Sequence, residues 1–235
     1  MRNKLVSFVV LVSAYILTIS GVAAAQGAYI SGTSGLDVSY PNCSARISKT
    51  AFGIVGVTQG LFYSYNGCLA SQAAHFSDLS LYMNTGWYAQ SSHINPSSPK
   101  QCLAGDNNCL AYNYGYDAAL DAMSYANTQG VHSSSWWLDV ETANSWNTDT
   151  SQNRSSLQGS YNALLDSGVS AVGVYSTTAQ WQSITGGWLN GWANWGASTW
   201  STARQAATYC SGHQFTGGPT YLIQYKGKLD QDYAC

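Results

Sequence analysis

Short apolar segments that favour β-strands alternate with helical segments along most of this chain, and this alternation constrains the fold more than any other feature. The strand-like runs are rich in β-branched and aromatic residues, as buried strands are. They are Gly35–Tyr40, Phe52–Thr58, Leu79–Asn84, Ser135–Val140, Ala171–Tyr175 and Tyr221–Tyr225. Strand–helix alternation over about 200 residues predicts a parallel sheet, either open or closed into a barrel.

Two segments between these runs have the spacing of amphipathic helices. In Tyr112–Gln129 the larger side chains recur at intervals of three and four residues, and Gly130 follows. Ser151–Asp166 begins with residues that favour helix N-caps, and Gly168 follows it closely. No G-x-G-x-x-G motif follows the first strand, so a dinucleotide-binding sheet has no support. We therefore expect an α/β fold with a TIM-like (β/α) barrel.

The charge content excludes several classes of protein. Only 9% of the residues are charged, against roughly a quarter in an average soluble domain. The 9 Lys and Arg residues do not outnumber the 11 Asp and Glu residues, so there is no basic surplus to bind nucleic acid. Coiled coils and acidic disordered regions need more charge than this, whereas 45% hydrophobic residues can fill a core.

The first 25 residues are predicted to be a secretory signal peptide. Two basic residues, Arg2 and Lys4, precede an apolar stretch, and an A-x-A sequence ends at Ala25. The apolar stretch is shorter than the roughly 20 residues that a membrane-spanning helix needs. We therefore expect a secreted chain, residues 26–235, that forms a single domain and has no membrane contact in its mature form.

Six cysteines lie in the expected mature chain, and an even number in an exported protein predicts disulfides. No C-x-x-C occurs, and the spacings are not those of a zinc site. Six cysteines allow 15 pairings, of which we expect Cys43–Cys68, Cys102–Cys109 and Cys210–Cys235. The pair Cys102–Cys109 lies within residues 88–116, which we expect to form a loop insertion.

The single glutamate of the chain is its most informative acidic residue. Ten of the eleven acidic residues are Asp, and Glu141 ends the sequence WWLDVE, which has strong strand character. Side chains at i and i+2 of a strand share a face, so Asp139 and Glu141 would project together, about 7 Å apart at their roots. Two carboxyl groups this close do not both ionise readily, which gives a proton donor beside a negative charge, as glycoside hydrolysis requires. The alternative is that Asp139 caps a turn and Glu141 is exposed.

Two further acids lie near predicted strands. Asp37 lies inside the first strand, and Asp230 follows the last one by a few residues. Each has an ordinary alternative, because Asp is common in turns and in buried hydrogen-bond networks. Closure of a barrel makes the first and last strands neighbours, and catalytic groups lie at the carboxyl ends of barrel strands. We therefore expect both acids near Glu141.

Several short segments also occur in an order that resembles a known family. They are Gly35–Ser39 (GLDVS), Phe52–Val57 (FGIVGV), Leu138–Thr142 (LDVET), Val172–Ser176 (VGVYS), and Ile223–Tyr225 with Leu229–Asp230 (IQY…LD). This order is similar to that of family-25 glycoside hydrolases, which are secreted lysozymes (N-acetylmuramidases) with an irregular TIM-like barrel. The resemblance covers most of residues 35–233. The chain departs from it at Thr58–Gly60, where the family usually has R-A-T-E-G.

The resemblance implies roles for four acids. Glu141 would be the general acid. Asp139 would stabilise an oxocarbenium ion, or an oxazolinium ion formed by the acetamido group of the substrate. Asp37 and Asp230 would support the pocket. The implied substrate is β-linked, N-acetylated cell-wall glycan of the peptidoglycan type, and no metal or other cofactor is implied.

Aromatic side chains are candidates for sugar binding. The chain has 9 Trp and 17 Tyr residues, and aromatic rings pack well against the C–H faces of sugars. More than half of the Trp residues are expected to pack in the core. Trp137 is a candidate because it is expected to share the strand face of Asp139 and Glu141, and Trp146 because it lies in the loop just beyond. Tyr175 ends a predicted strand and can donate a hydrogen bond into the site. Tyr40 and Gln224 are further candidates.

The predicted function is therefore that of a secreted, monomeric glycoside hydrolase of the lysozyme type. One alternative is a catalytically inactive carbohydrate-binding barrel of the cell envelope, which the departure at Thr58–Gly60 favours; another is a structural envelope protein braced by disulfides. Other chemistries lack a motif, because the histidines form no H-E-x-x-H and no G-x-S-x-G occurs. Asn153-Arg154-Ser155 is an N-glycosylation sequon, meaningful in a eukaryotic source.

Overall fold

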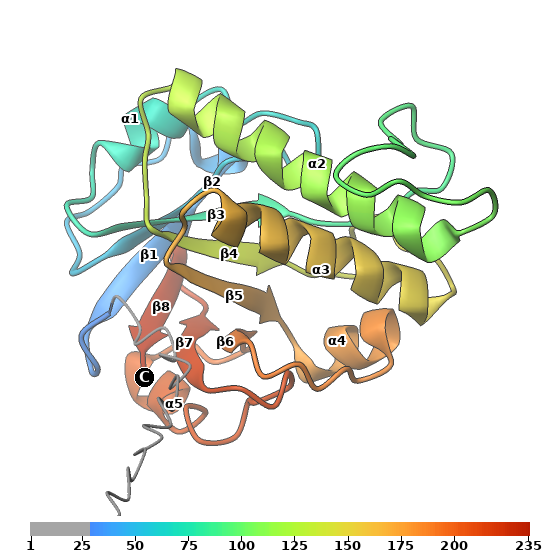
Figure 1. Ribbon diagram of the computed structural model, residues 1–235. Helices are drawn as coiled ribbons and strands as arrows, with labels where there is room; N and C mark the ends of the chain where they lie inside the picture. Colours follow the sequence, from blue (N-terminus) through green and yellow to red (C-terminus); the bar gives the residue numbers. More distant parts are fainter. Residues whose placement is uncertain (1–28) are drawn as a thin grey trace, which may run out of the picture.

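The computed structural model describes residues 29–235, which form a closed barrel of eight strands, as expected (Figure 1). The predicted signal peptide, residues 1–25, lies outside the described residues. The strands are β1 Ser34–Val38, β2 Gly53–Gly56, β3 Leu79–Asn84, β4 Ser135–Asp139, β5 Ala171–Ser176, β6 Ala193–Ala197, β7 Thr220–Tyr225 and β8 Asp230–Ala234.

The strands follow one another around the barrel in chain order, and β1 to β7 run parallel. β8 is antiparallel to both of its neighbours, β7 and β1. Only residues 226–229 connect β7 to β8, too few for the crossover that a parallel pair needs. The expectation that Asp230 follows the last strand is therefore wrong, because Asp230 begins β8.

Helices cover the outside of the barrel unevenly. They are α1 Leu69–Ala73, α2 Asn107–Thr128, α3 Thr150–Asp166, α4 Thr178–Thr185 and α5 Ala203–Ala207, with a single 3-10 turn, η1 Tyr40–Asn42, after β1. The long helices α2 and α3 lie side by side over β3, β4 and β5 (Figure 1). With no helix in the β7–β8 connection, the barrel is an irregular version of the (β/α) fold.

The helix α2 begins earlier than its apolar spacing predicts. Asp106 is its N-cap, and the Asp106 carboxylate accepts the backbone N–H of Cys109 at 2.9 Å. Residues 107–116 are therefore helical, and the expected loop insertion at 88–116 ends at residue 106. The disulfide Cys102–Cys109 joins this loop to the first turn of α2.

Two glycines allow α2 and α3 to approach closely. A Cβ at Gly115 of α2 would lie 1.9 Å from the carbonyl oxygen of Ser156 on α3. A Cβ at Gly159 of α3 would lie 2.0 Å from the carbonyl oxygen of Tyr112 on α2. Ser160 Oγ donates to the carbonyl of Gly115 at 2.8 Å across the same contact. The two helix backbones therefore touch directly.

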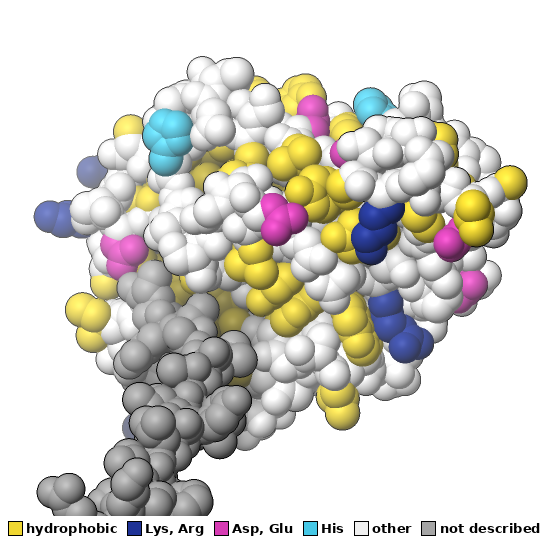
Figure 2. All heavy atoms as spheres, in the orientation of Figure 1, with side chains coloured by type: hydrophobic (Ala, Val, Ile, Leu, Met, Phe, Trp, Pro, Cys, Tyr) yellow, Lys and Arg dark blue, Asp and Glu magenta, His cyan; other side chains and the backbone are white. Residues whose placement is uncertain are grey.

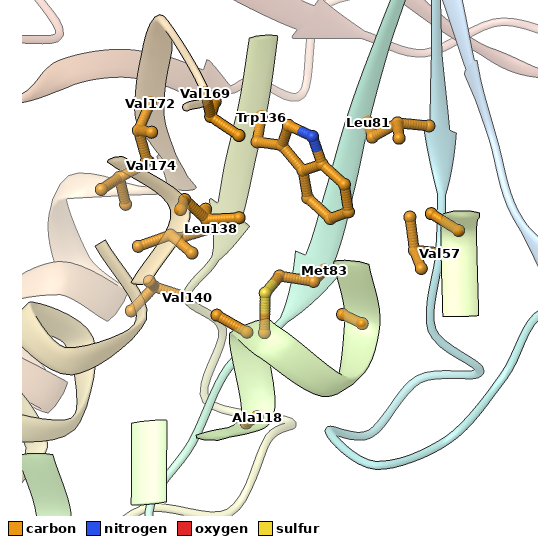
Figure 3. Packing of buried hydrophobic residues seen from close by; sticks show 14 of the residues in the cluster. Val57, Leu81, Met83, Ala118, Trp136, Leu138, Val140, Val169, Val172 and Val174 are labelled. Atoms are coloured by element: carbon orange, nitrogen blue, oxygen red, sulfur yellow. The ribbon is translucent and has the colours of Figure 1, made fainter. Parts of the chain in front are cut away.

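The main apolar core lies between the barrel and its helices. Strand alternation sends Trp136 and Leu138 of β4 outward into this layer, where they meet Met83 of β3 and Ala118 of α2 (Figure 3). Leu138 and Met83 have no exposed surface. The adjacent residues of each strand point into the barrel, so the same alternation places the polar site residues there.

Aromatic rings fill the barrel interior. Trp137 of β4 and Trp195 of β6 pack there with Phe52, Ile54 and Leu222, their rings 5.7 Å apart. Tyr29 closes the end of the barrel at which the strands β1 to β7 begin. Its hydroxyl donates to Ser80 Oγ at 2.6 Å and accepts the indole N–H of Trp137 at 2.9 Å.

The three expected disulfides are confirmed. Cys43–Cys68, Cys102–Cys109 and Cys210–Cys235 have Cα–Cα distances of 5.6, 5.5 and 5.4 Å. The last one fixes the end of β8, where hydrogen bonds join the first and last described segments. Gly32 N–H donates to the carbonyl of Ala234 at 2.9 Å, and Ser31 Oγ donates to that of Cys235 at 2.7 Å.

Charged side chains are sparse on the face that α2 and α3 cover (Figure 2). Within residues 29–235, no helix has the length and apolar character that a membrane span requires.

Candidate active site

Five carboxyl groups gather where the parallel strands of the barrel end. Asp37 lies near the end of β1, Asp139 is the last residue of β4, and Glu141 follows two residues later. Asp230 and Asp232 come from the antiparallel strand β8, whose first residues reach the same end of the barrel. The sequence-predicted set of Asp37, Asp139, Glu141 and Asp230 is therefore brought together.

Asp139 is buried within the barrel, with a side chain only 4% exposed. Its Oδ2 accepts a hydrogen bond from the side-chain amide of Asn84 at 2.5 Å, while Oδ1 is buried with no partner among the described residues. Burial raises the pKa of Asp139 well above its usual range, and the charges of Glu141 and Asp37 add to this. Asp139 therefore keeps its proton to a higher pH than a free aspartate does.

Glu141 lies just beyond β4 and is partly exposed. The indole N–H of Trp146 donates to its backbone carbonyl at 2.7 Å and so holds the main chain at this point. Burial raises the pKa of Glu141, the side chain of Gln180 lowers it, and the charge of Asp230 raises it. Glu141 thus keeps its proton to a higher pH than a free glutamate and remains accessible from solvent.

Asp37 is held by a relay of side chains from β5 and β7. The amide of Gln224 donates to Asp37 Oδ2 at 2.9 Å, and the hydroxyl of Tyr175 donates to Gln224 Oε1 at 2.8 Å. Burial raises the pKa of Asp37 to about 7, which the hydrogen bond from Gln224 opposes and the charge of Asp230 reinforces. Of the two predicted sugar-binding residues, Gln224 therefore contacts the acidic cluster directly, and Tyr175 contacts it through Gln224.

Asp232 is a fifth acid that the sequence did not single out. It is fully buried, its Oδ1 accepts the indole N–H of Trp195 at 2.8 Å, and its Oδ2 has no partner among the described residues. Burial and the charge of Asp37 raise its pKa well above the usual range. Its position two residues after Asp230 would have pointed to it, had residues 230–234 been recognised as a strand.

Asp230 lies at the rim of the site, and its side chain is exposed. Partial loss of solvent raises its pKa. It pairs in register with Asp37 across β1 and β8, and its charge acts on Asp37, Glu141 and Asp232. Asp230 is therefore the outermost member of the cluster.

Trp137 shares the inward face of β4 with Asp139, as expected, but it lies deeper in the barrel. Its indole is 3% exposed and packs between Tyr29 and Trp195. Gly173 of β5 makes room for it, because a Cβ there would lie 2.3 Å from the indole ring. The burial corrects the expectation that Trp137 offers a face to sugar. Its place is below the acids, in the floor of the site.

Trp146 and Tyr40 lie on loops beside the site. Trp146 is partly buried against the main core, and its N–H is used by the carbonyl of Glu141, so it supports the loop that carries the glutamate. Tyr40, in η1, is 40% exposed, and its ring lies next to Gly60 after β2. Of the predicted aromatic residues, Tyr40 has the most accessible ring.

Three polar residues that the sequence did not reveal also line the inner end of the site. Thr58 follows β2, while Tyr82 and Asn84 lie on β3. Tyr82 is raised in pKa by its burial and by the charges of Asp37, Asp139 and Glu141, so its ring lies near all three carboxyl groups. Thr, Tyr and Asn carry no sequence signal of catalysis, and only the barrel geometry identifies them.

The sequon residue Asn153 lies outside this site and is buried. Its side-chain amide donates to the backbone carbonyls of Asn147 and Ile184 at 2.8 and 2.9 Å. Both amide hydrogens are thus engaged in the folded chain, which leaves no position for a glycan.

A family model described as Lysozyme-like protein 1 matches residues 107–215, slightly less than half of the chain. The matched segment begins with α2 and includes Asp139 and Glu141. A search of curated protein sequences finds no significant match.

Solved structures share the whole fold at low sequence identity. The muramidase from Acremonium alcalophilum has a TM-score of 0.54 at 16% identity, over 86% of this chain and 93% of its own. GHIP, a glycosyl hydrolase 25 of Streptococcus pneumoniae, has a TM-score of 0.53 at 16% identity, over 86% and 87%. The catalytic domain of endolysin ply40, from bacteriophage P40 of Listeria monocytogenes, has 0.51 at 14%, over 86% and 93%. The similarity establishes the fold and confirms the expected barrel of the family-25 type.

Proposed function

We propose that this chain is a secreted glycoside hydrolase that cleaves β-linked, N-acetylated cell-wall glycan of the peptidoglycan type. The observation that carries the proposal is that two carboxyl groups with raised pKa values lie close together. Asp139 is buried and its Oδ1 has no hydrogen-bond partner among the described residues, whereas Glu141 is partly exposed. Hydrolysis of a glycosidic bond needs one carboxyl group that gives a proton and a second that faces developing positive charge. The muramidases that share the fold support the choice of substrate.

Glu141 is the proposed general acid. Its proton passes to the glycosidic oxygen as the bond to the anomeric carbon breaks, and the departing sugar leaves with a hydroxyl group. The anomeric carbon then carries positive charge, which is stabilised by Asp139 or by the substrate's own acetamido oxygen. Water adds to that carbon and returns a proton to Glu141, which restores the enzyme.

The other acids support this pair. Asp37 acts on Asp139, and Asp232 acts on Asp37; in its ionised form each brings negative charge to the barrel mouth, which stabilises a cationic transition state. Asp230 acts on Glu141 from the rim and helps to keep it protonated. Tyr40 supplies an exposed ring on which a sugar can stack.

The substitution Glu141→Gln tests the proposal. Wild-type protein should release new reducing ends from peptidoglycan, and E141Q should lose this activity by about two orders of magnitude or more. Asp166→Asn is the matched control, because it makes the same chemical change at the exposed C-terminal end of α3. The control should fold and cleave peptidoglycan normally.

Wild-type protein that binds peptidoglycan without cleaving it would contradict the enzyme and favour the inactive glycan-binding barrel. Chitin as a substrate tests whether the lactyl groups of peptidoglycan are required.

Secretion has its own test, since the N-terminal sequence of the exported protein should begin at Gln26. Sedimentation of the purified protein should give a monomer.

A further inference from the structure

Three buried polar side chains form a continuous chain of hydrogen bonds at the ends of β2, β3 and β4. Thr58 Oγ1 and Asn84 Oδ1 are 2.7 Å apart, and Asn84 Nδ2 and Asp139 Oδ2 are 2.5 Å apart. Thr58, Asn84 and Asp139 are 2%, 6% and 4% exposed. The chain therefore lies inside the protein and ends on an acid of the proposed site.

The donors and acceptors of this chain have one consistent direction. The backbone N–H of Asn84 donates to Thr58 Oγ1 at 2.9 Å, so the hydroxyl hydrogen of Thr58 is free to point at Asn84 Oδ1. Asn84 Oδ1 is then the acceptor, which turns Nδ2 toward Asp139. Thr58 thus fixes which end of the Asn84 amide meets the carboxyl group.

This direction distinguishes the two oxygens of Asp139. An amide N–H only donates, so Oδ2 acts as an acceptor, and Oδ1 is the oxygen left for a proton or a ligand. Oδ1 has no partner among the described residues, although it is buried. A buried polar atom without a partner costs free energy unless something else binds it, which makes Oδ1 the atom available to a ligand.

The main chain of Asp139 is fixed as well. Asn84 and Asp139 are paired in the β3–β4 register, and the N–H and hydroxyl of Thr85 both donate to the Asp139 carbonyl, at 3.1 and 2.6 Å. Asn144 Nδ2 donates to the same carbonyl at 3.1 Å. Because the backbone is held in place, the main remaining motion of Asp139 is rotation of its carboxyl group. The hydrogen bond from the Asn84 amide restricts this rotation.

We propose that Thr58 and Asn84 are positioning residues that present Asp139 Oδ1 to the acetamido group of the bound sugar. In its ionised form Oδ1 accepts the acetamido N–H, and this contact turns the acetamido oxygen toward the anomeric carbon. The inference rests on the proposed function for its substrate. The hydrogen-bond chain itself does not depend on that function.

Several titratable groups face Asp139 and contribute to its titration. They are Asp37 from β1, Tyr82 from β3, Glu141 beyond β4 and Tyr175 from β5. A hydrogen bond from Asn84 stabilises the ionised form of Asp139, so loss of its correct orientation should raise the pKa of Asp139 further. None of the facing groups is altered by a substitution at Thr58.

Thr58→Val and Thr58→Ser form the decisive pair. T58V keeps the shape and removes the hydroxyl, whereas T58S keeps the hydroxyl. We expect kcat of T58V on peptidoglycan to fall about tenfold, the effect of one hydrogen bond, with KM changed less than about twofold. The acid limb of its pH profile should move to higher pH, and T58S should resemble wild type.

A spectroscopic readout makes the test independent of turnover. Carbon NMR of the Asp139 carboxyl group, assigned with Asp139→Asn, should give a higher pKa in T58V than in wild type or T58S. Thr185→Val is the control, because the buried Thr185 hydroxyl likewise accepts one backbone N–H and donates to a carbonyl, but in α4. T185V should lose stability and leave the titration of Asp139 unchanged.

The outcomes separate this inference from the proposed function. A T58V variant with wild-type kcat, pH profile and Asp139 titration overturns the positioning role, even if E141Q is inactive. A wild-type protein without turnover overturns the function, and an unshifted Asp139 titration in T58V then overturns the relay as well. If T58V does not fold, Asn84→Asp replaces it. That variant places a carboxyl oxygen against Asp139, and the relay requires that the pKa of Asp139 rise in it.

Discussion

Asp37 and Asp230 lie directly opposite each other in the antiparallel pairing of β1 and β8. Because β8 runs against its neighbours, its first residue reaches the end of the barrel where β1 finishes. Residues directly opposite in such a pair point to the same face, so Asp230 joins Asp37 and Asp232 follows one layer deeper. A parallel eighth strand would carry these acids to the other end of the barrel.

The cluster of acids predicts that stability falls as pH rises through the weakly acidic range. Burial raises the pKa of Asp37 to about 7, and it also raises those of Asp139 and Asp232. Between about pH 4 and pH 7 the folded chain holds protons that the unfolded chain has released, so raising the pH favours unfolding. Each such group contributes up to about 1.4 kcal/mol per pH unit.

Urea unfolding at intervals across this range measures the slope. Asp37→Asn should flatten it, because an amide does not titrate. An increase of stability from about pH 4 to pH 7 would contradict the raised pKa values.

The alkaline limb of the pH–rate profile should depend on Gln180. A general acid works only while protonated, so cleavage should decline as Glu141 ionises, and Gln180 lowers the pKa of that group. Gln180→Leu should therefore keep its activity to a higher pH than wild type. Gln182→Leu, an exposed position on the same helix, should leave the profile in place. An unchanged alkaline limb in Gln180→Leu would separate Glu141 from the proton-transfer step.

The close contact of α2 and α3 predicts a large effect of one methyl group. Gly159→Ala would place its Cβ against the Tyr112 carbonyl, and the helices would have to separate. We expect a loss of about 1–3 kcal/mol in the free energy of unfolding, from thermal or urea denaturation. Gly67→Ala is the control, since nothing lies within 4 Å of its Cβ position. Equal stability of the two variants would show that α2 and α3 adjust without cost.

The floor of the barrel depends on the hydroxyl of Tyr29. Tyr29→Phe keeps the ring and leaves the indole N–H of Trp137 and the hydroxyl of Ser80 without their partner. A buried donor without an acceptor costs about 1–3 kcal/mol, which urea unfolding resolves. Tyr65→Phe removes a hydroxyl bound to Asp121 at the surface and should cost less. A Tyr29→Phe protein as stable as wild type would mean that another group takes over the N–H of Trp137.

The strands that composition predicts well are those with β-branched and apolar side chains on both faces. Leu79–Asn84 is predicted with its observed bounds, because one face packs against helices and the other fills the barrel. Composition does not predict the strand Ala193–Ala197 (ANWGA), since Ala, Asn and Gly do not favour strands. It is a strand because β5 and β7 lie on both sides of it and Trp195 fills the interior.

The acidic pair could be found from the sequence because carboxyl groups two residues apart on a strand are a chemical signal in themselves. Asp232 is not identified because the sequence predicts no strand after Tyr225, and Asn84 and Thr58 have no local signal at all. Their importance arises from contacts between residues 26 and 55 positions apart, made only when the barrel closes. The neutral hydrogen-bonding residues of a site are thus the ones that a single sequence does not predict.

The reversed strand β8 also decides where the two ends of the described chain lie. Hydrogen bonds from Ser31 and Gly32 to the last two residues place both ends together, beneath the floor of the barrel and away from the acids. A surface anchor or a fused module attached at residue 235 would therefore leave the mouth open to a polymer as large as a cell wall. The same proximity means that a short linker could join the ends and allow new ones to be cut elsewhere, giving a circular permutant with an intact site.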